Sequence, residues 1–190
     1  MKEFISATEE KVMTLVLLVT IAMLWFPIGL FYFGQGDAKT CGAIAGFVGI
    51  ITCIGGIIHA TPLFGSDAFT ATLLIPFGIV YLTISYCMLN GVEDLRSLGN
   101  LSLMMAIILA IAAYFYFTGG GIKPDGTSFI GKSLYLGCMM VAFVVLTVTV
   151  WAVTYGKLSP RVLGALLIVL SFLGLLVPAY DLIGFGKLPF

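Results

Sequence analysis

Charged side chains are scarce in this sequence. Only 9% of the 190 residues are Asp, Glu, Lys or Arg, 61% are hydrophobic, and the mean hydropathy is +1.16. A water-soluble domain of this length carries roughly 25% charged residues to cover its surface. The shortage excludes a water-soluble fold and requires an outer surface that faces lipid. The formal net charge is zero, which also excludes nucleic acid as a partner, because phosphates need an excess of Lys and Arg.

Histidine and paired cysteines are equally scarce. The chain has one histidine, His59, and four cysteines, none of which stands in a C-x-x-C spacing. All four cysteines lie within apolar runs, where cysteine behaves as a small hydrophobic residue. The paired His and Glu of a zinc protease are missing as well. The sequence therefore indicates no metal site, no cofactor and no enzyme.

Ionisable side chains are missing from the middle of the apolar runs. Proton-coupled carriers and pumps use such groups at mid-membrane depth, whereas here His59 and Asp181 stand near the ends of their runs. We interpret His59 as an interfacial residue. Uncharged hydroxyls do occur in the runs, and they favour a path for a small neutral solute over one for an ion, which needs replacement of its hydration shell. These hydroxyls belong to Thr83, Ser85, Tyr86, Ser102, Thr147, Thr149 and Ser171.

Six apolar runs are present, each of about 20 residues or more, the length that a membrane-spanning helix requires. They cover residues 12–33, 39–60, 69–90, 98–117, 131–155 and 160–183, and the connections are short and rich in Gly, Pro or charge. The sequence predicts an all-α integral membrane protein with six transmembrane helices. Residues 12–190 form its membrane domain, and residues 1–11 are interpreted as an N-terminal extension that forms an interfacial helix.

The charges of the connections indicate an orientation. The first, third and fifth connections carry four cations, against five on the opposite side. Positive charges in short connections close to helix ends mark the cytoplasmic side, and this slightly favours the odd-numbered connections as cytoplasmic. Both termini are then expected on the outer side of the cell membrane.

An aromatic pair stands in the third run. Phe77 and Tyr81 are four residues apart, so their rings share one face of a helix. Two such rings can form a slot for a flat neutral molecule such as urea or acetamide, whose dehydration costs far less than that of an ion. The same rings can also pack between helices, and both interpretations remain open at this point.

Several motifs occur in a characteristic order: "DAKTCGAIAGFVG" (37–49), "FGIVYL" (77–82), "GVEDLRSLGNLSLMMA" (91–106), "GKLSP" (156–160) and "VPAY" (177–180). With this order and spacing, the chain resembles the urea and amide channel family, AmiS/UreI. The resemblance implies a six-helix protomer with its own pore, assembled into a homo-oligomeric ring (a hexamer), with both termini on the outer side of the membrane.

The resemblance also implies roles for individual residues. Phe77 and Tyr81 match family positions that narrow the pore, and a looser alignment places Val141 and Val145 where the family has constricting tryptophans. Asp94 and Arg96 match a charged pair that would act as a structural staple at the pore mouth. The further pore-lining candidates are the hydroxyls of Thr83, Ser85 and Ser171.

We therefore expect a passive membrane channel for small neutral solutes, most simply urea or short-chain amides. Two alternatives remain. One is an acetate or small-carboxylate channel, a six-span class that carries an Asn-Pro motif near its start; this sequence lacks that motif. The other is a non-transporting membrane subunit, which would contain no continuous pore.

Overall fold

The computed structural model describes residues 2–62, 66–124 and 126–189, with side chains from Met13 onward. Six helical segments in these ranges are long and apolar enough to cross a membrane. The described residues form no named strand, so the predicted all-α, six-span architecture is confirmed. In order, the helices are α1 (Lys2–Phe31), α2 (Ala38–His59), α3 (Ala68–Asn90), α4 (Arg96–Thr118) and α5 (Leu134–Thr154), followed by α6 (Pro160–Leu170), a π-helix (Ser171–Leu176) and α7 (Val177–Phe185), which together make the last span.

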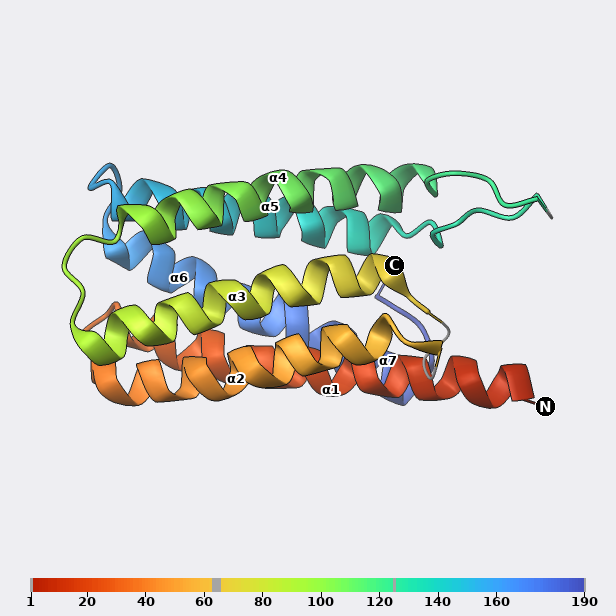
Figure 1. Cartoon of the computed structure of the whole chain (residues 1–190), viewed down its shortest axis with the longest axis horizontal. Coiled ribbons are helices and arrows are strands. Elements are labelled where there is room, and N and C mark those ends of the chain that lie inside the picture. Colours follow the sequence, from red (N-terminus) through yellow and green to blue (C-terminus); the bar gives the residue numbers. More distant parts are fainter. Residues whose placement is uncertain (1, 63–65, 125, 190) are drawn as a thin grey trace.

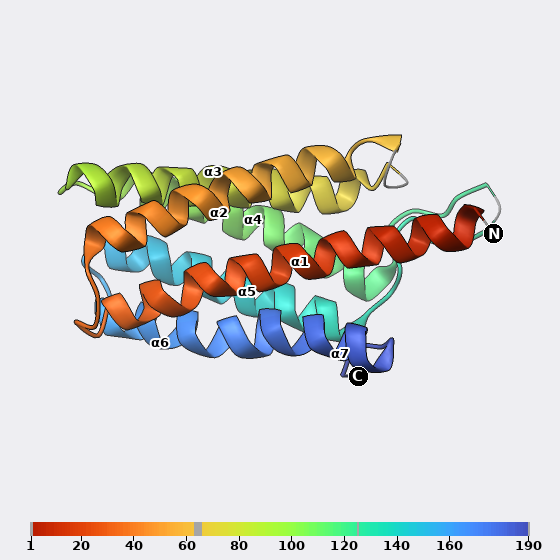
Figure 2. The same cartoon turned by 90° about the horizontal axis from the view of Figure 1, so that it is seen from below.

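The helices run up and down along one common axis (Figure 1). Both termini lie at the same end of the bundle, and the first, third and fifth connections lie at the other end. Residues 2–11, interpreted from the sequence as an N-terminal extension that forms an interfacial helix, are helical and continuous with the rest of α1. Figure 2 shows α1 crossing the bundle between α2 and α6.

Short polar side chains begin four of the helices. Asp37 and Asp67 accept hydrogen bonds from the backbone amides three residues later, at 2.8 and 3.0 Å, and so cap α2 and α3. Ser133 does the same for α5, and Ser159 caps α6 from two residues away. These oxygens satisfy amides that have no partner inside the helix. The caps set where these helices begin: α2, α3 and α6 begin close to the predicted positions, whereas α5 begins after Ser133, later than the predicted residue 131.

Glycines set the closest helix contacts. A Cβ atom added to Gly49 of α2 would lie 3.1 Å from the Gly78 carbonyl oxygen of α3, and one added to Gly78 would lie 3.0 Å from the Gly49 oxygen. The Gly29–Gly164 pair has the same reciprocal geometry between α1 and α6, at 2.9 and 2.8 Å. Small residues let helix backbones approach within a membrane, where no hydrophobic effect drives the helices together. The α2–α3 and α1–α6 contacts therefore depend on glycine.

Candidate permeation pathway

A cavity of about 540 Å³ lies among α1, α3, α4, α5 and α6. Its wall includes Glu93 from the connection between α3 and α4, Gly156 from the connection between α5 and α6, and Pro160, the first residue of α6. These residues are exposed, so the cavity has its mouth at the end of the bundle that carries the odd-numbered connections. Its wall deeper in the bundle contains Trp25 and Tyr81. The cavity is therefore a vestibule that enters the bundle from one side.

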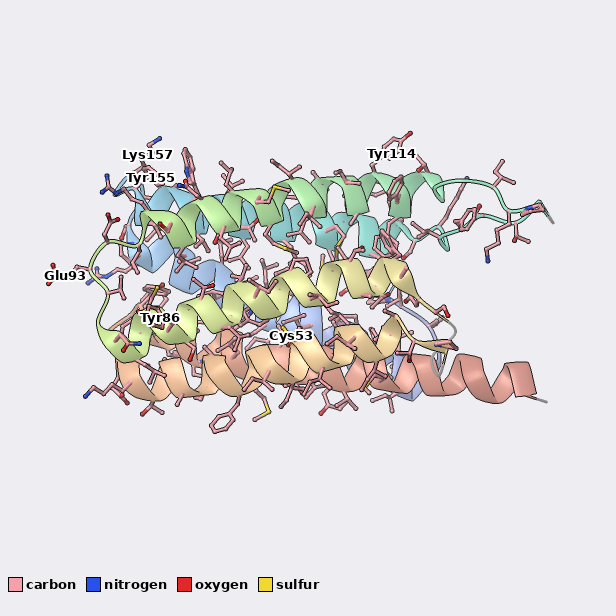
Figure 3. All side chains as sticks on the ribbon, viewed as in Figure 1. Cys53, Tyr86, Glu93, Tyr114, Tyr155 and Lys157 are labelled. Atoms are coloured by element: carbon pink, nitrogen blue, oxygen red, sulfur yellow. The ribbon has the colours of Figure 1, made fainter. Side chains whose placement is uncertain are left out.

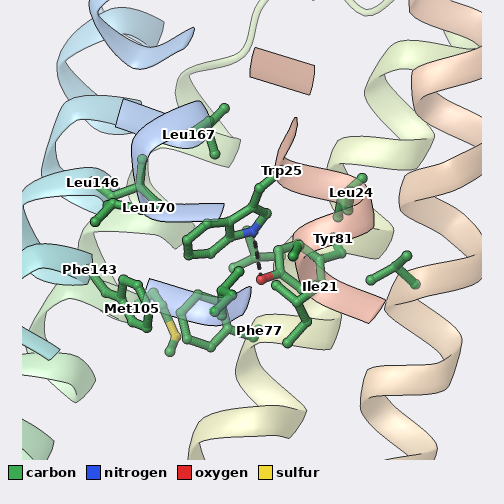
Figure 4. Close-up of a cluster of buried hydrophobic side chains, with 14 of the residues drawn as sticks. Ile21, Leu24, Trp25, Phe77, Tyr81, Met105, Phe143, Leu146, Leu167 and Leu170 are labelled. Atoms are coloured by element: carbon green, nitrogen blue, oxygen red, sulfur yellow. Dashed lines mark hydrogen bonds between the residues drawn. The ribbon is translucent and has the colours of Figure 1, made fainter. Parts of the chain in front are cut away.

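Four aromatic side chains meet at the deep end of the vestibule (Figure 4), and we refer to Trp25, Phe77, Tyr81 and Phe143 as the aromatic cluster. The Phe77 and Tyr81 rings are stacked, with centroids 5.8 Å apart and planes at 26°. The edge-to-face contact between Trp25 and Phe143 has a centroid distance of 5.2 Å. Aromatic pairs of this kind stabilise the fold by more than the burial of their apolar surface alone would. Rings from α1, α3 and α5 therefore join at one depth.

A hydrogen bond fixes the orientation of two members of the cluster. The Trp25 Nε1–H donates to the Tyr81 hydroxyl oxygen at 3.0 Å, drawn as a dashed line in Figure 4. Both side chains are 3% exposed. An indole nitrogen can only donate, so the Tyr81 oxygen is the acceptor in this pair.

Two small hydroxyls also line the vestibule. Ser102 Oγ of α4 donates to the Leu98 carbonyl oxygen at 3.0 Å, and Thr147 Oγ1 of α5 donates to the Phe143 carbonyl oxygen at 2.9 Å. Each hydroxyl proton is thus used within its own helix, a common arrangement for Ser and Thr in apolar helices. The hydroxyl oxygens keep lone pairs that can accept hydrogen bonds.

The predicted pore-lining residues fall into two groups. Phe77 and Tyr81 both line the vestibule, and their role in selecting solutes stays a prediction. Thr83, Ser85 and Ser171 do not belong to its wall. Thr83 donates to the Ile79 carbonyl of its own helix, and Ser85 lies against Gly46 of α2. Ser171, the first residue of the π-helix, is fully buried and donates to the Ile168 carbonyl.

The residues predicted as pore-lining in α5 lie on a different face of the helix from the one that lines the vestibule. Val141 and Val145 are 47% and 51% exposed on the outer surface of the chain and are not part of the vestibule wall. The wall is formed instead by Leu146, Thr147 and Val150. Each residue turns a helix by about 100°, so Thr147 lies about 200° around the helix from Val145. An error of two residues in a loose alignment is enough to exchange the two faces.

Sequence reasoning missed Trp25 and Phe143. Trp25 is one of two tryptophans in the chain, but nothing near it in the sequence indicates that it faces Tyr81. Ser102 and Thr147 were noticed as hydroxyls in apolar runs, without a signal that separates them from Thr149. Their shared depth in the bundle becomes visible only when the helices are placed side by side.

The charged pair predicted at the mouth is formed. Arg96 Nη2 lies 2.6 Å from Asp94 Oδ2, and Arg96 Nε donates to Asp94 Oδ1 at 2.9 Å. These hydrogen bonds from the guanidinium lower the pKa of Asp94 to about 2, although both side chains are exposed. At the same end, Lys157 lies 4.2 Å from the centroid of the Trp151 ring, and Figure 3 shows Lys157 beside Tyr155.

His59 ends α2, as the sequence indicated, but its side chain does not face an interface. It is fully buried. Its Nε2 lies 3.4 Å from Thr14 Oγ1, and its Nδ1 lies 3.9 Å from Asp67 Oδ2. The sequence places His59 at the end of a span, and the structure adds that contacts with Thr14 of α1 and with Asp67 accompany its burial.

Comparison with known proteins agrees with this geometry. The crystal structure of the urea channel from the human gastric pathogen Helicobacter pylori superimposes with a TM-score of 0.75 at 19% identity, over 92% of this chain and 99% of that chain. The cryo-EM structure of the Helicobacter pylori urea channel in the closed state gives a TM-score of 0.72 at 19% identity, over 89% of this chain and 96% of that chain. At this identity the likeness establishes the fold.

No curated protein shows significant similarity to this chain. The model of the AmiS/UreI family of transporters, however, matches residues 13–184, which include the first five spans and all of the sixth except its last residue. The chain is therefore a multi-pass membrane protein that belongs to the AmiS/UreI family of transporters.

Proposed function

We propose that this chain is a passive channel for small, planar, neutral solutes, namely urea or short-chain primary amides, and that it has no catalytic role. The observation that carries the proposal is the vestibule itself. It runs from a mouth at one end of the bundle to stacked aromatic rings, and Glu93, at the exposed mouth, is the only formally charged residue among the described residues of its wall.

The apolar lining of the vestibule suits a neutral solute, because a neutral solute loses little free energy when it leaves water. An ion that enters an aliphatic and aromatic cavity loses hydration energy that no charge or ring of carbonyls replaces. Urea and acetamide lose far less, and their flat shape suits a passage between rings such as Phe77 and Tyr81. The two similar solved structures are those of a urea channel, which supports the same solute class.

The alternatives are less well supported. An acetate channel would need a cation or a set of donors along the path to replace water around the carboxylate, and no Lys or Arg belongs to the described wall of the vestibule. A non-transporting subunit would have no use for a vestibule of about 540 Å³ that reaches the middle of the bundle. We therefore retain the neutral-solute channel.

The vestibule ends at the aromatic cluster in this conformation. Permeation then requires side chains of the cluster to move aside, and we propose that the cluster is the narrowest part of the path. We further propose that the protein forms a homo-oligomeric ring with one path in each copy. The termini would lie outside the cell membrane and the vestibule mouth at the cytoplasmic face, in agreement with the short cationic connections at that end.

Stopped-flow light scattering of proteoliposomes tests the function. Vesicles that contain the protein should equilibrate urea and acetamide faster than empty vesicles of the same lipid and size. Acetate at a pH well above its pKa should show no acceleration. Equal urea and acetamide rates with and without protein would refute the proposal, and protein-dependent acetate flux would favour the carboxylate channel.

A further inference from the structure

A groove lies on the outer surface of the bundle between α3 and α4. It has a volume of about 180 Å³, and the residues of its wall are all apolar: Pro76, Ile79, Val80, Leu101, Met104, Met105 and Ile108. The α3 members are spaced i, i+3, i+4 and the α4 members i, i+3, i+4, i+7, so each set forms one stripe along its helix. The groove is therefore the seam where these two stripes meet.

The close glycine contacts of α3 and α4 are turned away from this seam. Gly78 of α3 meets Gly49 of α2, and Gly99 of α4 lies against Thr154 of α5. Figure 1 shows the same pairing, with α3 beside α2 and α4 beside α5. Small residues let helix backbones approach in a membrane, whereas the stripes along the seam carry Ile, Leu and Met. The α3 and α4 backbones are thus held apart, and space remains between their side chains.

The groove has an exposed rim and a buried floor. Ile79 and Met104 are 46% and 55% exposed, whereas Val80 and Met105 are 7% and 1% exposed. Ile79 stands at the centre of the 23-residue α3, which crosses the hydrocarbon interior of a bilayer. The groove therefore opens toward lipid chains and not toward water or headgroups.

The floor of the groove is also part of the vestibule wall. Val80 lines both spaces, and Leu101 of the groove is followed in sequence by Ser102 of the vestibule. The two spaces thus lie on opposite sides of one layer of side chains. Any change in the groove reaches the vestibule through Val80.

The chemistry of the wall requires an apolar occupant. Water needs two or more polar partners in a cavity, and apolar cavities of about 150 Å³ stay dry and bind benzene or xenon. An empty groove would leave the side chains of its wall without dispersion partners on one side. Hydrocarbon chains of the bilayer meet the rest of this surface at the same depth, and they can supply these contacts.

We infer that the groove is a binding site for one hydrocarbon chain of a membrane lipid, which lies between α3 and α4 against Val80 and Met105. The chain fills a seam that glycines close elsewhere in the bundle. It also forms the outer support of the vestibule wall at Val80. This inference goes beyond the proposed transport function, and its test by labelling does not depend on solute flux.

Photolabelling in proteoliposomes tests the site. The probe is a phosphatidylcholine that carries a diazirine in the middle of one acyl chain, and mass spectrometry of peptides locates the adducts. Ile50 of α2 is the matched reference for Ile79, because it is 51% exposed and lies outside the groove wall. The two isoleucines follow Gly49 and Gly78, whose mutual contact places them near the same depth.

A chain held in the groove should label Ile79 more than Ile50. We expect a ratio of about 3-fold or more, which corresponds to a handful of additional dispersion contacts. Equal labelling would mean that only the ordinary lipid surface is present, and weaker labelling of Ile79 would mean that protein, such as a second copy of this chain, covers the seam. Either result overturns the inference.

Filling the groove should abolish the excess. Met104→Trp places a large ring at the rim, so the ratio of Ile79 to Ile50 labelling should fall to about one, the value for equal contact with lipid. Ile107→Trp is the control, because Ile107 is 52% exposed on the same helix but lies outside the groove wall. An excess that survives Met104→Trp, or one that Ile107→Trp removes equally, contradicts a site in the groove.

Thinning the floor should join the two spaces. In Val80→Ala the lipid chain should reach the vestibule side, and label should appear on Ser102, which stays unlabelled in the parent. Unlabelled Ser102 in Val80→Ala would overturn the role of the chain as support of the vestibule wall. Size-exclusion profiles in detergent verify the fold of each variant, and the ratio in the parent tests the site without any substitution.

Discussion

The rings of Phe77 and Phe143 meet edge to face, with centroids 6.4 Å apart and planes at 90°, although they belong to different helices. Phe77 comes from α3 and Phe143 from α5, so the contact joins two walls of the vestibule at its deep end. The position of either ring sets how far the vestibule extends. Both side chains are nearly buried, at 9% and 5% exposed.

Replacing the Phe143 ring with a smaller side chain should extend the vestibule deeper into the bundle. In Phe143→Leu the edge-to-face contact with Phe77 is lost and space opens beneath the vestibule, so the flux of butyramide should rise relative to acetamide. Phe172→Leu is the matched control, because Phe172 is 46% exposed and lies outside the vestibule wall. An unchanged butyramide-to-acetamide ratio in Phe143→Leu would show that this contact does not limit solute size.

Removal of the Tyr81 ring should change size selection before it changes folding. Tyr81→Ala deletes the stacked partner of Phe77 and the acceptor for Trp25, and we expect a folded protein that admits larger amides. The measurement is the relative flux of acetamide, butyramide and benzamide in proteoliposomes. An unfolded variant, or a folded one with the size selection of the parent, would mean that the ring only packs the core.

Solute flux should be nearly independent of pH between 5 and 8. No described carboxylate, lysine or arginine lies in the vestibule below its mouth, and the single histidine, His59, is buried near Asp67 and Thr14 outside the vestibule wall. Urea flux at matched osmotic gradients checks this expectation. A steep acid activation that disappears in His59→Ala would assign pH sensitivity to the His59–Asp67 contact, and one that persists would assign it to a carboxylate.

The Asp94–Arg96 pair should hold the mouth together without selecting solutes. We expect Arg96→Ala to reduce expression or ring assembly, measured by size-exclusion chromatography, and to leave the solute selectivity of the surviving protein intact. An altered urea-to-acetamide ratio in Arg96→Ala would instead place the pair in the selectivity machinery.

The same pair predicts a pH window. The pKa of Asp94 is lowered in the folded protein from 3.8 to about 2, so its contribution to stability is complete above the ordinary pKa and is lost as the pH falls through the folded value. Acid sensitivity from this pair should thus appear only below about pH 4, and Arg96→Ala should remove it. Thermal unfolding in detergent as a function of pH measures the effect.

Labelling with an impermeant maleimide tests the proposed orientation. Leu95 lies between the two members of this pair, in the connection that we place in the cytoplasm. A Leu95→Cys variant, in a background where the native cysteines are replaced, should react in inside-out vesicles and remain unlabelled in intact cells. Strong labelling from outside intact cells would reverse the orientation of all six spans.

The sequence alone determined the number of spans and their ends. These features depend on local properties, namely runs long enough to cross a bilayer, the absence of mid-span charge, and capping residues such as Asp37 and Ser133. The stacking of Phe77 and Tyr81 was predictable for the same reason, because two residues four apart share a face of any helix. The motifs around Asp94 and Arg96 further sufficed to indicate the family.

Only the tertiary structure decided which side of each helix faces the vestibule. A helix in water reveals its inner face by an apolar stripe, whereas a helix in lipid is apolar all round and carries no such signal. For that reason the sequence does not show that Thr147 rather than Val145 faces the vestibule, or that the side chain of His59 is buried. The pairing of Trp25 with Tyr81 joins positions 56 residues apart in the chain, and it arises because the packing of α1 against the other helices brings the indole to the phenol, a relationship that no local pattern encodes.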